Sequence, residues 1–497
     1  MDLKQLQNGS DIRGIALGEK ANLTGEAVYR IAKAFAAWLA ARLNKSSPTI
    51  AVGMDSRLSG PAFRQECIRA FSDSGANVVD CGLASTPAMF MTTVTDGFEC
   101  DGAAMITASH LPVDRNGLKF FTKDGGLEKS DIAKILSIAE GGAFITGCGS
   151  IAEKDFISVY AKILMDKVRT ATGEERPLAG LKIIVDAGNG AGGFYVDKVL
   201  KPLGADTRGS QFLNPDGSFP NHVPNPEDET AMRSIMDAVK KWNADFGIIF
   251  DTDVDRAAAV DKGGVEMGRN RLIAAISAIL IAEHQGATIV TDSITSSGLA
   301  EFIAAKGGRH HRFKRGYKNV INEAVRLNSE GIYTPLAIET SGHAALMENY
   351  FLDDGAYLVT RLVIQLARLR KENRALASMI TDLKEPAESS ELRPRILAED
   401  FRAYGNKVVG DLTAFAKKDP KYKIAPDNFE GIRVAFGKED GDGWFLLRLS
   451  LHEPLLPINI ESDSAGGARK IAQRLYDFLL QYKELDLKPL ASFLKEA

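Results

Sequence analysis

Three apolar segments of this 497-residue chain end at an aspartate that stands beside a small residue. They end in Val52–Asp55, Val185–Gly188 and Val290–Ser293. Short apolar runs that stop in this way are typical of buried strands, and a strand that leads into a helix is the repeating element of α/β proteins. The repeat therefore predicts three similar α/β units in one chain.

The first of these units shows the pattern most clearly. Residues Glu26–Leu43 predict an amphipathic helix, with Ile31, Phe35 and Leu39 on one face. The apolar run Thr49–Met54 predicts the buried strand that follows it.

Length and composition narrow the class of protein. A chain of 497 residues exceeds what one hydrophobic core holds, so we expect three or four domains. Hydrophobic residues make up 45% and charged residues 25%, which is ordinary for a soluble globular enzyme. The net charge of −4 argues against a nucleic-acid partner, since nucleic-acid binding favours a basic surface.

The cysteines and the apolar runs favour a cytoplasmic location. Four cysteines lie in the first third of the chain without a C-x-x-C spacing, which suits thiols in a reducing compartment. The N-terminal residues are too polar for a signal peptide. The longest apolar run, residues 272–282, is too short to cross a bilayer, so we expect no membrane partner.

The segment Met105–Phe121 gathers a serine, a histidine and a lysine. Small and β-branched residues predict the end of a buried strand, which Pro112 prevents from continuing. Asn116–Gly117 predicts a tight turn and Leu118–Phe121 a second strand, so the segment reads as a loop within a hairpin. The candidate catalytic residues of this loop are Ser109, His110 and Lys119.

A cluster of carboxylates follows the strand predicted over Ala244–Phe250. Three aspartates at alternating positions on one bend form a hard oxygen cluster suited to Mg²⁺ or Ca²⁺. A calcium EF-hand is excluded, because it needs Gly at its sixth position and Glu at its twelfth, where this chain has Arg256 and Lys262. A solvated acidic turn is the alternative, although adjacent carboxylates repel one another without a cation. The three aspartates are Asp251, Asp253 and Asp255.

Both motifs resemble one family. Thr-Ala-Ser-His-x-Pro followed by Asn-Gly-x-Lys, over residues 107–119, resembles the active-serine loop of the α-D-phosphohexomutase superfamily, the phosphoglucomutases and phosphomannomutases. Leu111 departs from the asparagine that is usual there. Asp-x-Asp-x-Asp-Arg, over residues 251–256, is similar to the metal loop of that family. The resemblance implies that Ser109 carries a phosphoryl group and that Arg256 reaches the substrate. The Mg²⁺ ligands that it implies are phosphorylated Ser109, Asp251, Asp253 and Asp255.

Further loops extend the resemblance along the chain. Gly9–Gly14 and Arg315–Lys318 are similar to segments that line the active site of the family, and Glu339–His343 resembles its sugar-binding loop. Either His343 or Lys119 is implied as the general acid/base, and Thr340 leaves the preferred sugar open. The substrate contacts that the resemblance implies are Arg13, Arg256, Lys318, Glu339, Ser341, His343, Arg448, Ser450 and His452.

The last of these loops contains a second difference from the family pattern. Arg448–Pro454 resembles the family's phosphate loop, Arg-x-Ser-x-x-x-Pro, in which arginine grips a phosphate with two donors. Leu451–His452 replaces the Gly-Thr or Asn-Thr of most relatives. This change motivates an alternative function, a hexose 1,6-bisphosphate synthase that releases the bisphosphate.

The resemblance implies three similar α/β mixed-sheet domains plus a smaller α+β C-terminal domain around a central cleft. The boundaries we expect are 1–175, 176–285, 286–385 and 386–497. The implied activity is a phosphohexomutase that acts on glucose or mannose phosphates through phosphoserine and a 1,6-bisphosphate intermediate. Its cofactors are Mg²⁺ and hexose 1,6-bisphosphate, its partners are small sugar phosphates, and it is a monomer or homodimer.

Two other classes of protein are alternatives. Gly188, Gly190 and Gly193 satisfy the dinucleotide fingerprint with Asp206 downstream, although glycines here also let a strand turn tightly into a helix. A catalytically silent sugar-phosphate sensor is the other alternative, and intact Ser109 with its carboxylates argues against it. In the Pro- and Asn-rich segment 214–226, we interpret His222 as a residue that fixes the loop.

Overall fold

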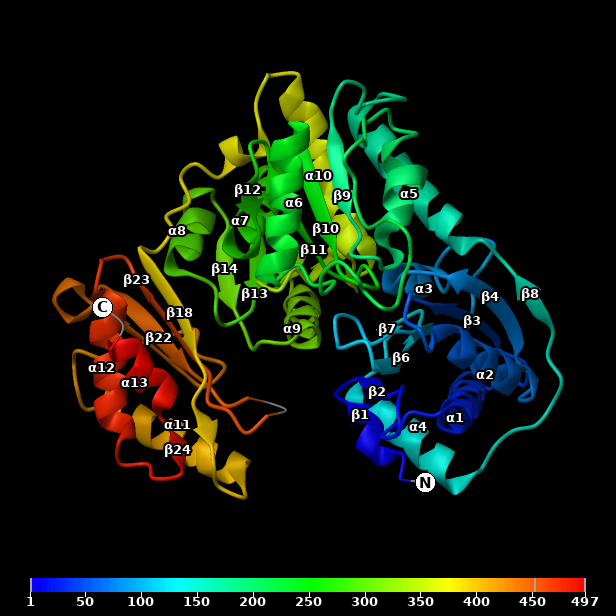
Figure 1. The fold of residues 1–497 in the computed structure, drawn as a ribbon, viewed down its shortest axis with the longest axis horizontal. Helices are drawn as coiled ribbons and strands as arrows, with labels where there is room; N and C mark the ends of the chain where they lie inside the picture. Colours follow the sequence, from blue (N-terminus) through cyan, green and yellow to red (C-terminus); the bar gives the residue numbers. More distant parts are fainter. Residues whose placement is uncertain (1, 451–452, 496–497) are drawn as a thin grey trace. The chain divides into compact units, whose positions relative to one another are not determined.

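The structure is a computed structural model that describes residues 2–450 and 453–495. The chain divides into two compact units. The first contains residues up to 276 together with 341–379, and the second contains 277–340 and 380–497 (Figure 1). No helix in the described ranges combines the length and apolar character that a membrane span requires.

The first unit begins with a mixed eight-stranded sheet in the order β1-β2-β6-β5-β3-β4-β8, with β7 paired to β6. Its strands are β1 (Gln7–Asn8), β2 (Asp11–Ile15), β3 (Thr49–Met54), β4 (Asn77–Leu83), β5 (Gly102–Ile106), β6 (Arg115–Thr122), β7 (Gly125–Gly126) and β8 (Ile151–Glu153). Its helices are α1 (Gly25–Leu43), α2 (Gly60–Ser72), α3 (Thr86–Met91), α4 (Lys129–Gly141) and α5 (Phe156–Thr172). The predicted face of α1 is buried against this sheet, where Phe35 stacks on Phe120 with ring centroids 4.2 Å apart.

The hairpin that carries the candidate serine differs from its prediction at one point. β5 and β6 pair antiparallel, as expected, but Asn116–Gly117 lies inside β6, so the predicted tight turn at this dipeptide is wrong. Gly117 serves close packing instead, because a Cβ there would lie 2.3 Å from the carbonyl oxygen of Ile12 and 2.8 Å from that of Thr107. The serine loop therefore runs between Ile106 and Arg115.

A second sheet of the first unit has the order β12-β11-β10-β9. Its strands are β9 (Ile183–Asp186), β10 (Phe246–Phe250), β11 (Ala257–Asp261) and β12 (Val265–Met267). β10 is parallel to β9 and antiparallel to β11. The amphipathic α6 (Glu229–Trp242) packs its apolar side chains on this sheet, and α10 (Gly355–Arg370) also contacts it. A short antiparallel pair, β16 (Ala344–Leu346) and β17 (Leu352–Asp353), precedes α10, while α7 (Arg269–Glu283) begins in this unit and ends in the second.

The second unit combines a parallel and an antiparallel part. β14 (Arg309–Arg312), β13 (Thr288–Thr291) and β15 (Leu336–Ile338) are parallel, and α8 (Ser297–Ala305) and α9 (Tyr317–Ser329) pack on them. The C-terminal sheet is β18-β23-β22-β21-β20. Its strands are β18 (Glu388–Leu392), β20 (Lys423–Ile424), β21 (Ile432–Phe436), β22 (Gly443–Leu447) and β23 (Ile458–Ser462). The C-terminal part also contains the antiparallel pair β19 (Arg395–Ile396) and β24 (Leu485–Asp486), with α11 (Phe401–Ala416), α12 (Gly467–Leu479) and α13 (Lys488–Lys495).

These sheets and helices confirm the predicted fold class, mixed α/β domains followed by a smaller α+β part. The four domain boundaries stay a prediction. Asp55 directly follows β3, and Asp186 is the last residue of β9. Each accepts a hydrogen bond from the backbone N–H two residues later. The aspartate of the strand-end repeat therefore starts the turn into the next element.

Candidate active site

Ser109 occupies a strained position after β5. Its backbone is left-handed, with φ of 50°, a conformation that non-glycine residues adopt mainly where the surroundings enforce it. The side chain is buried, and its hydroxyl donates a 2.9 Å hydrogen bond to Asp251 Oδ2. Arg256 Nη2 donates to the same hydroxyl oxygen at 3.2 Å. The fold thus places the predicted nucleophile between the carboxylate of Asp251 and the guanidinium of Arg256.

The three predicted carboxylates meet directly after β10. Asp251, Asp253 and Asp255 are each at most 1% exposed, and one ligand atom of each lies within 4.8 Å of the others. The left-handed Val254, with φ of 67°, bends the chain between the last two. Within the described residues, Asp253 Oδ1 and Asp255 Oδ1 are buried without a hydrogen-bond partner. Buried, unpaired carboxylate oxygens are costly unless a cation binds them, so this donor set fits a hard divalent ion.

Lys119 offsets part of this negative charge. Its ammonium group donates to Asp255 Oδ2 and lies 3.6 Å from Asp253 Oδ2. Burial acts to raise the pKa of Asp255, but the charges of Lys119, His343 and Arg256 together lower it below its ordinary value. The pKa of Asp251 is raised, first by burial and then by its two carboxylate neighbours. The repulsion expected among adjacent carboxylates is therefore present in the folded protein.

Arg256 is bound within the cluster instead of extending from it. Its side chain is fully buried, and both its backbone N–H and its Nε donate to Asp251 at 3.2 Å. Nη1 donates to Asn225 at 3.3 Å. The sequence predicted that Arg256 is free to reach a substrate, and this stays a prediction; in the structure its side chain bonds to Asp251 and Ser109.

His110 lies beside the serine as an uncharged ring. Its Nδ1 is 3.3 Å from Ser109 Oγ and also contacts Arg256 Nη2. Burial, followed by the charges of Arg256 and Arg13, lowers the pKa of His110 to about 2. The imidazole is therefore neutral at physiological pH and accepts hydrogen bonds through Nδ1. Arg13, in β2, also reaches this loop, because its Nη1 donates to the carbonyl oxygen of Ala108 at 3.4 Å.

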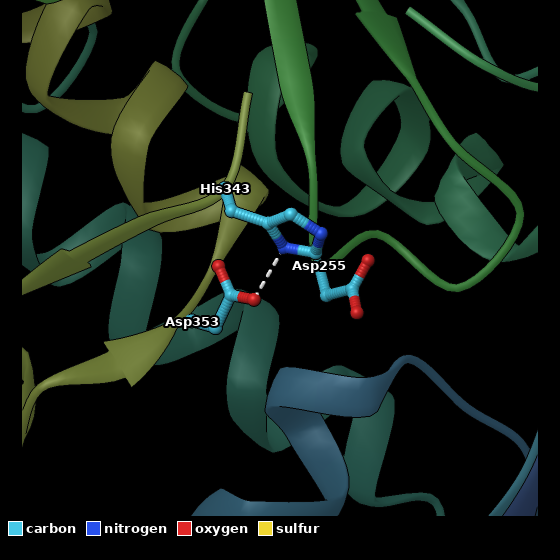
Figure 2. A group of neighbouring side chains, drawn as sticks. All are labelled: Asp255, His343 and Asp353. Atoms are coloured by element: carbon cyan, nitrogen blue, oxygen red, sulfur yellow. Dashed lines mark hydrogen bonds and ion pairs between the residues drawn. The ribbon is translucent and has the colours of Figure 1, made fainter. Parts of the chain in front are cut away.

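His343 lies between two carboxylates (Figure 2). Its Nδ1 hydrogen-bonds Asp353 Oδ2, and a backbone bridge joins it to Arg256, just before β11. Burial acts to lower the pKa of His343, but the charges of Asp353 and Asp255 raise it above its ordinary value. Burial also raises the pKa of Asp353 to about 6, although His343 opposes this. Asp353 is thus the partner that orients the predicted proton carrier.

Three residues of this site had no site role predicted from the sequence. Thr86, at the start of α3, donates its hydroxyl to Asp253 Oδ2 and its backbone N–H to the carbonyl oxygen of Asp253. Arg57 is fully buried and donates to carbonyl groups of the serine loop. Asp353 is the third, at the end of β17. No local pattern pointed to these three residues, because the role of each depends on a partner that the folded chain brings to it.

The remaining predicted residues of the first unit include one buried hydroxyl. Ser341 is buried, and its Oγ has no hydrogen-bond partner within the described residues. Ser341 belongs to the first unit and Glu339 to the second, so the predicted sugar-binding loop spans the point at which the chain passes between units.

The second unit contains the predicted phosphate loop and part of the predicted sugar loop. Glu339 Oε1 accepts a 2.6 Å hydrogen bond from the backbone N–H of Gly316, which precedes α9. Lys318 is the second residue of that helix. Arg448 is buried, 3.9 Å from Glu430, and Ser450 Oγ accepts from the backbone N–H of Glu453. Leu451 and His452 lie outside the described residues.

Glu430 connects these loops. Its Oε2 accepts hydrogen bonds from Ser293 Oγ at 2.6 Å and from the backbone N–H of Arg315 at 3.1 Å. Because Glu430 also faces Arg448, one carboxylate links the predicted phosphate loop to the segment before α9.

The glycine-rich turn after β9 packs against protein backbone. A Cβ on Gly190 would lie 2.5 Å from the carbonyl oxygen of Thr252, and one on Gly193 would lie 2.4 Å from that of Leu213. These glycines therefore let the turn approach the carboxylate loop, which agrees with the tight-turn interpretation. His222 Nε2 lies 3.1 Å from both oxygens of Asp186, so it attaches the Pro- and Asn-rich segment to the end of β9.

Comparisons with known proteins agree along most of the chain. Residues 4–145 match the family model described as phosphoglucomutase/phosphomannomutase, alpha/beta/alpha domain I. Residues 158–264 and 269–385 match domains II and III of the same description.

Whole-chain relatives support the same assignment. A phosphoglucomutase of Neisseria meningitidis serogroup A is 31% identical over 465 residues, which cover 93% of this chain and 94% of that protein. A phosphomannomutase/phosphoglucomutase of Pseudomonas syringae pv. tomato is 30% identical, with coverage of 93% and 92%. A crystal structure of a phosphoglucomutase/phosphomannomutase family protein from Burkholderia thailandensis superposes with a TM-score of 0.80, at 26% identity and coverage of 96% and 98%. This chain therefore belongs to the phosphoglucomutase/phosphomannomutase family of the α-D-phosphohexomutase superfamily, a family of isomerases that transfer phosphoryl groups.

Proposed function

We propose that this protein interconverts the 1- and 6-phosphates of glucose or mannose through phosphorylated Ser109. Family membership supports mutase activity on hexose phosphates. The observation that carries the phosphoserine proposal is the placement of Ser109. Its buried hydroxyl is bonded to Asp251 and Arg256 at the edge of a carboxylate cluster.

The carboxylate cluster is proposed to hold Mg²⁺. Asp251, Asp253 and Asp255 offer oxygen ligands, and the two buried oxygens without partners support this fit. An oxygen of the phosphorylated Ser109 would complete the set. When bound, the ion stabilises negative charge on the transferring phosphoryl group, which is the main demand of this chemistry.

Different side chains of the protein are proposed to stabilise the developing charge and to accept the proton. As a sugar hydroxyl oxygen forms its bond to phosphorus, the bond from phosphorus to Ser109 Oγ breaks and its electron pair stays on Oγ. Arg256 already donates to that oxygen, so it stabilises the charge that develops there. The hydroxyl proton passes to His343 or Lys119, both of which lie beside Asp255. A second transfer, from the bound 1,6-bisphosphate back to Ser109, yields the isomer.

The remaining predicted residues would bind the sugar phosphate. Arg448, with Ser450 and Lys318, is proposed to hold the phosphate that is not reacting, since a guanidinium binds phosphate with two donors. Glu339 and Ser341 are proposed to bind sugar hydroxyls, and the Ser341 hydroxyl without a protein partner supports this role.

A product assay by ³¹P NMR tests the proposal. Purified enzyme with Mg²⁺ receives glucose 1-phosphate and a catalytic trace of glucose 1,6-bisphosphate, and we expect glucose 6-phosphate to accumulate. Ser109→Ala should abolish the conversion, while Ser46→Ala, at an exposed position, should not change it. Conversion that survives in Ser109→Ala would contradict the phosphoserine mechanism.

The bisphosphate synthase is not favoured. The relatives described above carry mutase names, and Leu451 and His452, which motivated the alternative, lie outside the described residues. The same NMR experiment, with fructose 1,6-bisphosphate as donor, would reveal a synthase through steady accumulation of glucose 1,6-bisphosphate without net isomer.

A further inference from the structure

We propose that Arg57 is a positioning residue for phosphoryl transfer, because its guanidinium group holds the serine loop in the conformation that presents Ser109 Oγ to Asp251. This inference rests on the proposed function for its effect on rate. The loop geometry on which it depends can be tested independently of catalysis.

Arg57 donates hydrogen bonds to four backbone carbonyl groups of the serine loop. Nη1 donates to the carbonyl oxygens of Pro112 at 2.8 Å and Arg115 at 2.9 Å, while Nη2 donates to those of Ser109 and Leu111. Arg57 itself lies between β3 and α2, more than fifty residues before the loop. A single side chain therefore satisfies carbonyl acceptors from Ser109 to Arg115.

The four hydrogen bonds from Arg57 form a clamp on the serine loop, and their geometry is specific to arginine. A guanidinium presents its N–H donors in a rigid planar fork, whereas a lysine offers three donors at one point. The fork is itself fixed, because the backbone N–H of Arg57 donates to Asp55 at 2.9 Å and its Nε lies 3.6 Å from the other oxygen of that carboxylate. The Phe219 ring covers the guanidinium, with its centroid 5.4 Å away.

The clamp acts on the strained residue from its C-terminal side. The direction of the Ser109 carbonyl depends on the backbone torsion ψ of Ser109, and Arg57 holds that carbonyl. Thr107 Oγ1 holds the backbone N–H of Ser109 at 2.8 Å from the other side. Together these contacts stabilise the left-handed backbone from which Oγ reaches Asp251.

The test compares Arg57→Lys and Arg57→Gly with wild type and with Arg64→Lys. Arg64 is a matched control, since it lies in α2 and ion-pairs with Asp80. We expect kcat of Arg57→Lys to fall about 100-fold, the scale of a 1 Å misplacement of a reacting group. KM for glucose 1-phosphate should stay within about threefold, because substrate contacts are intact.

Guanidinium ion at concentrations below those that unfold the protein should raise the kcat of Arg57→Gly and leave that of Ser109→Ala unchanged.

Hydrogen–deuterium exchange reads the loop directly. In both Arg57 variants we expect faster exchange confined to residues 107–115, with α1 and the rest of the first sheet unchanged. A kcat for Arg57→Lys within about twofold of wild type, with unchanged loop exchange, would overturn the proposal. Loss of folding in both variants, or faster exchange throughout the sheet without guanidinium rescue, would also overturn it and make Arg57 a general structural residue. If wild type itself shows no Ser109-dependent conversion, the proposed function fails, while the exchange measurement still decides whether the clamp exists.

Discussion

The hydroxyl of Ser109 donates a hydrogen bond to Asp251, a residue 142 positions later in the chain. Ser109 follows β5 of the first sheet, and Asp251 follows β10 of the second. The bond therefore joins the loop of the proposed nucleophile to the loop of the proposed metal ligands. Both loops belong to the first unit, so the proposed nucleophile and the proposed metal ligands lie within one compact body.

Removal of one carboxylate should weaken Mg²⁺ binding and activity together. In Asp253→Asn we expect the Mg²⁺ concentration for half-maximal rate to rise about 100-fold, since even outer partners of a metal site change affinity by about 10- to 100-fold. EDTA should abolish wild-type activity and added Mg²⁺ should restore it. Rates measured across a Mg²⁺ titration check this, with Asp237→Asn on α6 as the control. Activity that persists in EDTA would refute a metal-dependent transfer.

Thr86 should strengthen Mg²⁺ binding at the same site without being a ligand. Its hydroxyl donates to Asp253 Oδ2, so Thr86→Val removes a donor and keeps the shape of the side chain. We expect half-maximal Mg²⁺ to rise about tenfold, while kcat at saturating Mg²⁺ changes little. Thr93→Val is the matched control, because the Thr93 hydroxyl donates to the carbonyl oxygen of Phe90 instead. An equal Mg²⁺ requirement in the two variants would show that Thr86 does not orient Asp253.

The sequence predicted local elements well because their patterns are local. The helix expected over Glu26–Leu43 is α1, Gly25–Leu43, and the strand expected over Thr49–Met54 is β3 with the same bounds. Amphipathic periodicity and apolar runs carry this information within one stretch of chain. The alternating aspartates of residues 251–255 likewise predicted a cluster of carboxylates, and the structure shows that cluster directly after β10.

Contacts between distant segments were beyond such patterns. Asn116–Gly117 has the composition of a turn, but pairing with β2 places it inside β6. Arg57 and Asp353 carry no local signal, since the role of each depends on the loop or ring that the tertiary fold brings to it. Motifs therefore predicted the reacting groups, and the structure shows the side chains that contact them.

Asp353 should influence turnover through His343. Asp353→Asn keeps the size of the side chain but removes the charge that raises the pKa of His343. If His343 carries the hydroxyl proton, we expect kcat to fall about 10- to 100-fold with KM little changed, a part of the range for general acid–base catalysis. Steady-state kinetics on glucose 1-phosphate check this, with Asp96→Asn at an exposed position as the control. An unchanged kcat would assign the proton transfer to Lys119.

Arg448 should act on substrate binding more than on turnover. Arg448→Lys keeps the charge but loses the planar fork that binds phosphate with two donors. We expect KM for glucose 1-phosphate to rise about tenfold, the equivalent of one lost charge-assisted hydrogen bond, with a smaller effect on kcat. Arg469→Lys, at an exposed position in α12, is the control. Equal KM values in both variants would exclude the predicted phosphate contact.

His222 should make the stability of the first unit depend on pH. Burial acts to lower its pKa, but the contact with Asp186 and the carbonyl oxygen of Val223 raise it above the ordinary value. A histidine with a raised folded-state pKa contributes stability that is fully present below the unfolded value of about 6.5 and is lost as pH rises through the folded value. We therefore expect His222→Gln to destabilise by about 1.5–3 kcal/mol at low pH, the scale of a charge-assisted hydrogen bond, and by less above the folded pKa.

Thermal unfolding at pH 6 and pH 9 measures this difference. The gap in midpoint between wild type and His222→Gln should narrow as pH rises, because deprotonation removes from the wild type the charge that the variant lacks at every pH. His284→Gln, at an exposed position, provides the control for the loss of one imidazole. A gap for His222→Gln that stayed constant or widened toward pH 9 would mean that the ring is neutral in the folded protein and fixes the loop as an uncharged hydrogen-bond partner.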